Sequence, residues 1–232
     1  MRLLSGALVA VLLTGATGST AWAQRVEERV DRTIPFQPGG TLRLKTFSGL
    51  VEIRGTEAAQ VVVRAVRRGR ADRMRDVAFD IQVNGSEVVI DANRNDGRRD
   101  DDNVVEADIY IDVPTRTRLN VTSFSAPVTV VGVDAEQAGL KTFSGNVTVA
   151  AGQWMDGQTV EIDTFSGAID LRVPGDARAE LAFNTFSGDL ETDVPITLSR
   201  ARGRRNVEGT LNGGGSGRVR LKTFSGDARL RQ

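Results

Sequence analysis

Hydroxyl side chains recur along this chain in one fixed setting, the tetrapeptide Thr-Phe-Ser-Gly. Five copies begin at Thr46, Thr142, Thr164, Thr185 and Thr223, and Ser123-Phe124-Ser125-Ala126 is a sixth, variant copy. A serine becomes a nucleophile only beside an activating base. The chain has no histidine and no cysteine, which excludes Ser-His-Asp and Cys-His sites and zinc sites built on those ligands. The repeated serines therefore predict a structural position and no catalytic residue.

Carboxylates are the remaining candidates for chemistry. Two of them, held roughly 5–9 Å apart, could act as the acid and the base of a glycosidase. Five are expected on outward strand faces, namely Glu161, Asp163, Asp170, Asp189 and Glu191. Exposed charges on the polar face of a strand are the ordinary case, so we favour a structural interpretation of these five.

A second acidic group lies in a polar, glycine-containing stretch at residues 94–103. Its oxygen ligands, which could hold Ca²⁺, are Asp96, Asp100, Asp101, Asp102 and Asn103. They lack the regular spacing of a calcium loop, and Arg94, Arg98 and Arg99 are interleaved with them. We favour a solvated charged loop over a cation site. The glycine-rich residues 213–217 lack the features of a phosphate or dinucleotide loop, so we expect no metal and no cofactor.

The spacing of the motif predicts the fold. Phe124, Phe143, Phe165 and Phe186 are 19, 22 and 21 residues apart, and 38 residues, twice 19, separate Phe186 from Phe224. Self-similarity at about 20 residues is typical of stacked repeats. Each copy lies between short runs that alternate apolar and polar residues, so the unit is strand, corner, strand. We predict an all-β, single-domain β-solenoid or β-helix-like repeat fold with an N-terminal hairpin elaboration.

We expect three segments along the chain. Residues 1–23 have the charge, the apolar run and the Ala21-Trp22-Ala23 cleavage site of a secretory signal peptide. Residues 24–40 are a charged lead-in, and residues 41–231 form the repeat domain. Within that domain, residues 60–113 interrupt the repeats. There we predict a strand at 61–66, one helical turn within 67–76, and a hairpin turning at Asn84-Gly85.

The signal peptide implies export, to the periplasm or to the exterior of the cell. No later segment approaches the roughly 20 apolar residues of a spanning helix, so we expect no membrane span in the mature chain. Thirty basic residues balance thirty acidic ones, and without a basic excess we expect no nucleic-acid partner. The absence of cysteine excludes disulfides.

Alternation along the strands predicts which motif side chains face inward. In residues 42–48 the leucines share parity with Thr46 and Ser48, while Phe47 shares parity with Arg43 and Lys45. We therefore expect threonine and serine inside, with hydroxyls bonded to each other or to corner backbone, and glycine where the corner needs φ > 0 or close approach of coils. The best-defined corner residues are Thr142, Ser144, Gly145, Thr164, Ser166 and Gly167.

The outward parity of phenylalanine predicts an aromatic stripe edged by lysine. Its members are Phe47, Phe124, Phe143, Phe165, Phe186 and Phe224, with Lys45, Lys141 and Lys222 two residues before three of them. One interpretation is that neighbouring rings stack and shield the corners. The other is that the stripe docks an envelope protein, a glycan or another copy of the chain.

The repeats resemble those of the bacterial putative-adhesin family, also called toastrack-type β-strand-repeat domains. Its units read approximately Leu-x-Val-x-Thr-x-Ser-Gly-x-Val-x-Val, and residues 140–149, 160–171 and 181–190 match them. The end of the chain, from Gly209 to Asp227, is similar to the usual C-terminal end of that family. The likeness covers about residues 41–231. One departure is that the residue between Thr and Ser, variable in the family, is phenylalanine in all six copies here.

The resemblance implies an all-β domain of the cell envelope without established catalytic residues, in a family where some members are tied to envelope stress. Together with the missing nucleophile–base pairs, it leads us to expect an exported, non-catalytic interaction module of adhesin type. Two alternatives are a carbohydrate-active enzyme on a β-helix scaffold and a passive self-associating protein.

Overall fold

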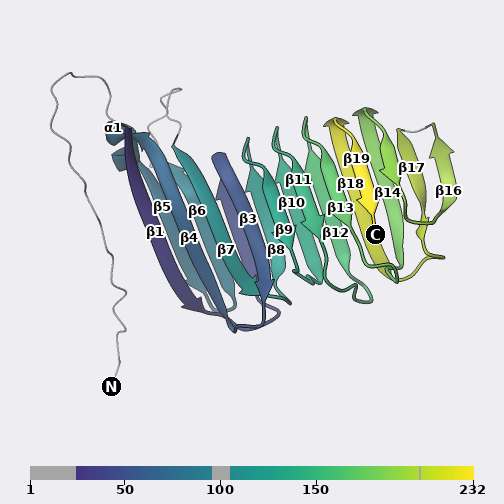
Figure 1. Ribbon diagram of the computed structural model, residues 1–232, viewed down its shortest axis with the longest axis horizontal. Helices are drawn as coiled ribbons and strands as arrows, with labels where there is room; N and C mark the ends of the chain where they lie inside the picture. The colour runs from purple at the N-terminus through teal and green to yellow at the C-terminus, as the bar shows by residue number, and fades with distance from the viewer. Residues whose placement is uncertain (1–24, 96–104, 204) are drawn as a thin grey trace.

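A computed structural model describes residues 25–95, 105–203 and 205–232. The expected signal peptide and the acidic residues 96–103 lie outside the described residues. The described chain is almost entirely β-structure, in two sheets that face each other (Figure 1).

The first sheet has nine strands. In spatial order they are β1 (Arg25–Pro35), β4 (Gln60–Arg70), β7 (Glu106–Pro114), β3 (Ser48–Thr56), β9 (Val128–Val131), β11 (Val147–Ala150), β13 (Ile169–Arg172), β19 (Ala228–Arg231) and β15 (Leu190–Thr192). The second has ten: β16 (Ile196–Arg202), β17 (Asn206–Leu211), β14 (Ala179–Ser187), β18 (Gly217–Ser225), β12 (Thr159–Thr164), β10 (Gln137–Thr142), β8 (Arg118–Ser123), β2 (Thr41–Thr46), β6 (Glu87–Asn95) and β5 (Val77–Asn84).

Each motif copy joins one strand of the ten-stranded sheet to one strand of the nine-stranded sheet. The strands before the motifs pair in parallel with one another, and so do the strands after them. Successive copies therefore form coils that stack in register, which confirms the predicted all-β, solenoid-like repeat fold.

The spatial order of the coils differs from their order in the chain. The last coil, β18 and β19, lies between the β12–β13 coil and the β14–β15 coil, and Figure 1 shows its yellow strands between green ones. The 38-residue spacing between Phe186 and Phe224 thus arises because the chain forms β14 to β17 first and then returns to place β18 between β12 and β14. Spacing records only how long a connection is, so it could not reveal this insertion.

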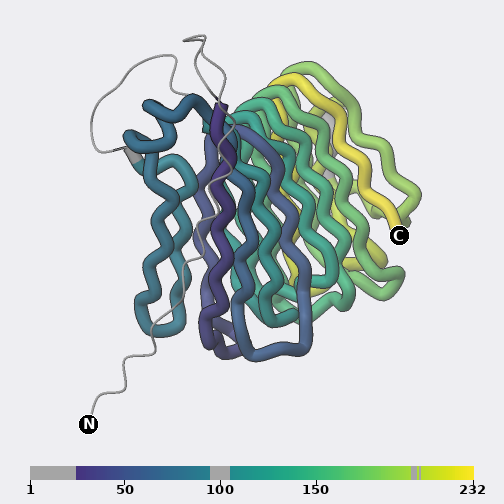
Figure 2. The backbone as a smooth tube through the Cα atoms, turned by 60° about the vertical axis from the view of Figure 1, so that its left-hand side comes forward, coloured from purple at the N-terminus to yellow at the C-terminus, as the bar shows by residue number. Residues whose placement is uncertain are grey.

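The first end of the stack is antiparallel. Residues 25–35, expected as a lead-in, form β1, which pairs with β4, and β4 pairs in turn with β7. The charges that made this segment look like a lead-in suit an edge strand, because charged edges resist pairing with other chains. The predicted helical turn is α1 (Ala71–Asp76), and the predicted hairpin is β5–β6, visible at the left of Figure 2. Only Gly85 of Asn84-Gly85 has positive φ, at 61°.

A buried arginine holds this elaborated end together. Arg67 of β4 donates from Nη1 to the Glu28 carboxylate of β1 at 2.6 Å and from Nη2 to the Val77 carbonyl of β5. Burial lowers the pKa of Arg67, and the charge of Glu28 opposes that shift. The side chain therefore links both sheets at the end where the regular coils stop.

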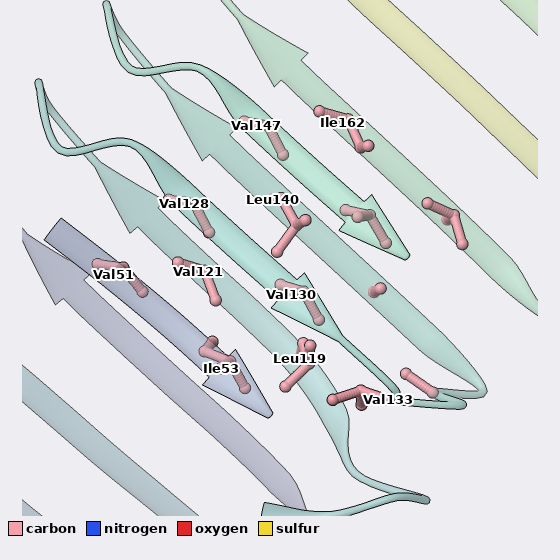
Figure 3. Packing of buried hydrophobic residues seen from close by; sticks show 14 of the residues in the cluster. Val51, Ile53, Leu119, Val121, Val128, Val130, Val133, Leu140, Val147 and Ile162 are labelled. Atoms are coloured by element: carbon pink, nitrogen blue, oxygen red, sulfur yellow. The ribbon is translucent and has the colours of Figure 1, made fainter. Parts of the chain in front are cut away.

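The core is the space between the two sheets. Most inward residues of the coils are apolar, and Val51, Ile53, Val121, Leu140 and Ile162 are typical members of this core (Figure 3). Period-two alternation places these side chains on one face of each strand. At roughly 25 cal/mol per Å² of buried apolar surface, this continuous core is the main source of stability.

The corners correct one part of the parity argument. The motif threonines are buried or half-buried, as expected, but five of the six serines that follow phenylalanine are exposed and Ser48 is half-buried. At residues 124–125, 143–144 and 165–166 the chain bends, so strand alternation stops before the serine of these corners. Ser144 and Ser166, assigned inward, therefore point outward.

Inward hydroxyls bond to the corner of their own coil. Thr142 Oγ1 donates to the Gly145 carbonyl at 2.6 Å, Thr164 Oγ1 to Gly167 at 3.2 Å, and Ser123 Oγ to Ala126 at 2.8 Å. Within the described part of the chain, Thr46, Thr185 and Thr223 show no partner for Oγ1. Ser123, Thr142 and Thr164 thus each close the corner of their own coil, and their hydroxyl groups form no ladder from coil to coil.

Close approach of coils explains the glycines at 145 and 167. Neither has positive φ. A Cβ at Gly145 would overlap the Ala126 carbonyl, and one at Gly167 would overlap the Gly145 carbonyl. Ala126 itself has no positive φ, which is why the variant corner accepts alanine without left-handed strain.

We expect Gly167→Ala to lower the free energy of unfolding by about 1–3 kcal/mol or more, because the added methyl group forces two coils apart. Gly139→Ala is the matched control, since a Cβ there would meet only the Leu119 carbonyl oxygen, at 3.9 Å. It should leave stability unchanged or slightly raised. Urea denaturation measures both, and equal unfolding free energies for the two variants would contradict the role given to the corner.

Candidate functional site

The six motif phenylalanines form a continuous stack, here called the phenylalanine ladder. In spatial order it runs Phe47, Phe124, Phe143, Phe165, Phe224, Phe186. Neighbouring ring centroids are 4.7–4.9 Å apart, and the ring planes differ by 2–4°. This spacing equals the distance between paired strands, so the backbone pairing of the coils sets the geometry of the rings.

Hydrogen bonds continue through the corners and fix the rings in place. Ser144 N donates to the Phe124 carbonyl at 2.9 Å, Ser166 N to Phe143 at 2.9 Å, and Ser225 N to Phe165 at 2.8 Å. The bend that carries each phenylalanine is thus paired with the bend of the next coil. The ladder is held by the backbone as firmly as the strands beside it.

Each ring presents its edge to the solvent. The four rings with a neighbour on both sides are 45–46 % exposed, while Phe186, the last of the stack, is 66 % exposed. Six of the ten exposed large apolar side chains in the described part of the chain belong to the ladder. The other three phenylalanines pack into or against the core, so the exposed aromatic surface is concentrated in one line.

Asn93 closes the other end of the ladder, a role that the sequence analysis missed. Its Oδ1 accepts from Phe47 N at 2.9 Å, and its Nδ2 donates to the Val105 carbonyl at 3.1 Å. It lies two residues beyond Asp91, which pairs with Lys45, so it occupies the ladder position of β6. The alternation of inward and outward residues over 88–93 predicts this position, because it continues the strand past Ile90 to Asn93.

The three lysines lie in the row beside the ladder, here called the charged row. From coil to coil it reads Asp91, Lys45, Thr122, Lys141, Asp163, Lys222, Asn184. Lysines are never adjacent, because Thr122 and Asp163 separate them. Lys222 Nζ lies 3.8 Å from Asp163 Oδ2, whereas no ion pair joins Lys45 or Lys141 to any described carboxylate. The row is therefore mixed in charge and not the lysine edge that the sequence suggested.

The ladder and the charged row border one groove on the outer face of the ten-stranded sheet. Its volume is about 510 Å³, and Lys141, Asp163 and Lys222 line it together with Phe165, Phe224 and Phe186. A hollow of about 620 Å³ lies where Arg116, Arg118, Glu136 and Met155 meet. None of its lining residues belongs to a repeated motif position, so the ladder groove is the better candidate for a site built by the repeats.

The five candidate carboxylates do not converge. Glu161 and Asp163 belong to the ten-stranded sheet, while Asp170 and Glu191 belong to the nine-stranded one. Four of the five form ion pairs with basic side chains, such as Glu161 with Arg220 at 3.6 Å and Asp170 with Arg231 at 3.8 Å. The bond from Arg229 Nε to Glu191, at 2.9 Å, raises the pKa of Arg229. These carboxylates form surface ion pairs on two opposite faces.

Among residues 25–95, 105–203 and 205–232, no three or more acidic side chains lie together where they could hold a metal ion. The same residues include no helix that is long and apolar enough to cross a membrane.

Comparison with solved structures finds this architecture in one of them. A solved structure described as a putative cell adhesion protein from Clostridium sporogenes superposes with a TM-score of 0.69 at 13 % identity, covering 90 % of this chain and 100 % of that one. A putative adhesin from Bacteroides fragilis matches with a TM-score of 0.36 at 10 % identity, over 88 % of this chain and 97 % of that one. No curated protein matches. The model of the family described as Toastrack DUF4097 matches residues 33–231, and the chain therefore belongs to that family.

Proposed function

We propose that this protein is an exported, non-catalytic interaction module of adhesin type in the bacterial cell envelope, and that it binds through the phenylalanine ladder and the charged row. The observation that carries the proposal is the exposure of six aromatic edges in one straight line beside a row of mixed charge. A solved structure with the same fold is described as a putative cell adhesion protein, which supports the proposal. Export rests on the signal peptide expected at residues 1–23.

The ladder contributes to stability, but stability does not require its edges to be exposed. Each of the five ring contacts is worth about 0.5–1.5 kcal/mol beyond the area that it buries. Exposure of the ring edges to water does not stabilise the fold. Contiguous apolar surface of this kind marks interaction sites in soluble proteins. The two interpretations of the stripe are therefore compatible, because ring faces serve the fold and ring edges remain for a partner.

The covered faces also favour one kind of partner. Ligands that stack flat on aromatic rings, as sugars do, find a largely open face only at Phe186. A protein surface can instead pack side chains against a row of edges and pair with the charged row. We therefore favour a protein partner over a glycan, and a carbohydrate-active enzyme is disfavoured because four of the five candidate carboxylates are held in ion pairs with basic side chains.

Melting temperatures test how much the ladder contributes to the stability of the fold. Phe143→Ser removes two ring contacts and Phe186→Ser removes one. We expect losses of about 1–3 and 0.5–1.5 kcal/mol respectively from stacking alone, and a correspondingly larger fall in melting temperature for Phe143→Ser. Calorimetry of both variants beside the unchanged protein measures this. A larger fall for Phe186→Ser would contradict the account of the ladder.

Binding to isolated bacterial envelopes tests the proposed function. Because Phe186 is the most exposed ring and has one ring neighbour, Phe186→Ser should leave the fold intact and weaken envelope binding roughly tenfold, as expected for an exposed aromatic contact at an interface. Val131→Ser is the matched control, since Val131 is 44 % exposed on the nine-stranded sheet. Co-sedimentation over a concentration series gives the affinities. Equal binding by the unchanged protein and both variants would exclude the ladder as the binding surface.

A further inference from the structure

We infer that the partner of the ladder is a second copy of this chain, docked ladder to ladder in an antiparallel dimer. The inference rests on the proposed function, because it takes the ladder to be an interaction surface and names its occupant. The two-fold axis would run along the strand direction, between the Phe143 coil and the Phe165 coil. Each coil would then face the coil at the mirrored position of the other copy.

The ladder is straight enough for such a contact. Ring planes change by only 2–4° from one coil to the next, and the six rings extend over about 24 Å at uniform spacings of 4.7–4.9 Å. Two twisted rows would diverge after one or two coils, whereas two straight rows of equal spacing remain in contact along their whole length. Ladder-on-ladder packing in this register covers all six rings of both copies.

The charged row is self-complementary in that same register. The axis between the two central coils places Lys141 opposite Asp163 of the other copy, twice. It places Lys222 opposite Thr122 and Lys45 opposite Asn184, so no like charges meet. The register of full ring overlap is therefore also one in which the row pairs opposite charges.

Neighbouring registers are penalised. Moving the axis onto the Phe143 coil brings Lys141 against Lys141 and Lys45 against Lys222. Moving it onto the Phe165 coil brings Asp163 against Asp163 and Lys141 against Lys222. Like charges placed opposite each other at an interface cost several kcal/mol. The row thus disfavours both registers in which the axis passes through a central coil, and the register of full ring overlap is free of such contacts.

The next row of the sheet disfavours the same two registers independently. It reads Arg43, Asn120, Gly139, Glu161, Arg220, Ala182 from coil to coil. With the central axis, Glu161 faces Gly139, Arg220 faces Asn120, and Arg43 faces Ala182. Moving the axis onto the Phe143 coil brings Arg43 against Arg220, and moving it onto the Phe165 coil brings Glu161 against Glu161. Two rows with different sequences therefore disfavour the same two registers and are both free of like-charge contacts at full ring overlap.

The contact ends at the third row. There Arg118 would face Arg218, but each is already paired within its own chain, with Glu136 and with Glu180 respectively. A contact about 24 Å long and three residues deep, counting the ladder, is smaller than the roughly 800 Å² per partner of stable complexes. The dimer is therefore expected to form at high concentration and to dissociate on dilution, as suits copies held close together on surfaces.

Charge exchange at the central pair tests the inference. The purified protein is followed by analytical ultracentrifugation over a broad concentration series, together with Lys141→Asp and Asp163→Lys. We expect a monomer–dimer equilibrium for the unchanged protein and a loss of roughly tenfold or more in dimer affinity for each single variant, because each creates two like-charge contacts. An equimolar mixture of the two variants should form a heterodimer, and the double variant should recover the homodimer. Thr148→Lys, on the other sheet, is the charge control and should change nothing.

Three results would overturn the inference. The first is an unchanged protein that remains monomeric at the highest concentration. The second is a dimer whose affinity does not respond to either exchange, and the third is a mixture of the single variants that does not associate. None of these outcomes decides the proposed function, because envelope binding by Phe186→Ser and Val131→Ser is measured separately. Loss of envelope binding in Phe186→Ser with a monomeric protein would identify a different partner for the same ladder.

Discussion

The distance between stacked coils is the constraint on which the rest of the structure depends. Backbone pairing fixes it near 4.8 Å, and at Gly145 and Gly167 the absence of a side chain leaves room for the carbonyl of the neighbouring coil. Once that distance is set, every position of the repeat becomes a row across the sheet with the same spacing. Phenylalanine in one row gives a ladder, and charged residues in the next give a row whose signs follow the order of the coils.

Much of this could be predicted from sequence, because parity along a strand is a local property. Thr142 and Thr164 are inward and Phe143 and Phe165 outward, as alternation predicts. The argument is wrong at Ser144 and Ser166, since the chain bends at the residue before them and alternation no longer applies. A bend is set by how one coil meets the next, and that contact is not visible in a single repeat.

The order of the coils could not be predicted either, and the charged row depends on it. With Lys222 placed after Asn184, as in the chain, the row would have another pattern. Because β18 pairs with β12 as well as with β14, Lys222 lies beside Asp163. The character of the groove therefore comes from topology, while the identity of its residues comes from the repeat. Asn93 is similar, since it belongs to no motif copy but continues the ladder position by register.

The insertion of β18 and β19 also has a consequence for folding. Strands β12 to β15 precede residues 217–231 in the chain, so until those residues pair, the β12–β13 coil and the β14–β15 coil each lack a neighbour on one side. Such edges invite pairing with other chains. The last coil thus pairs both of these edges, and a chain truncated before residue 217 would leave them unpaired. Closure of the stack therefore depends on residues 217–231, which join coils that precede them in the chain.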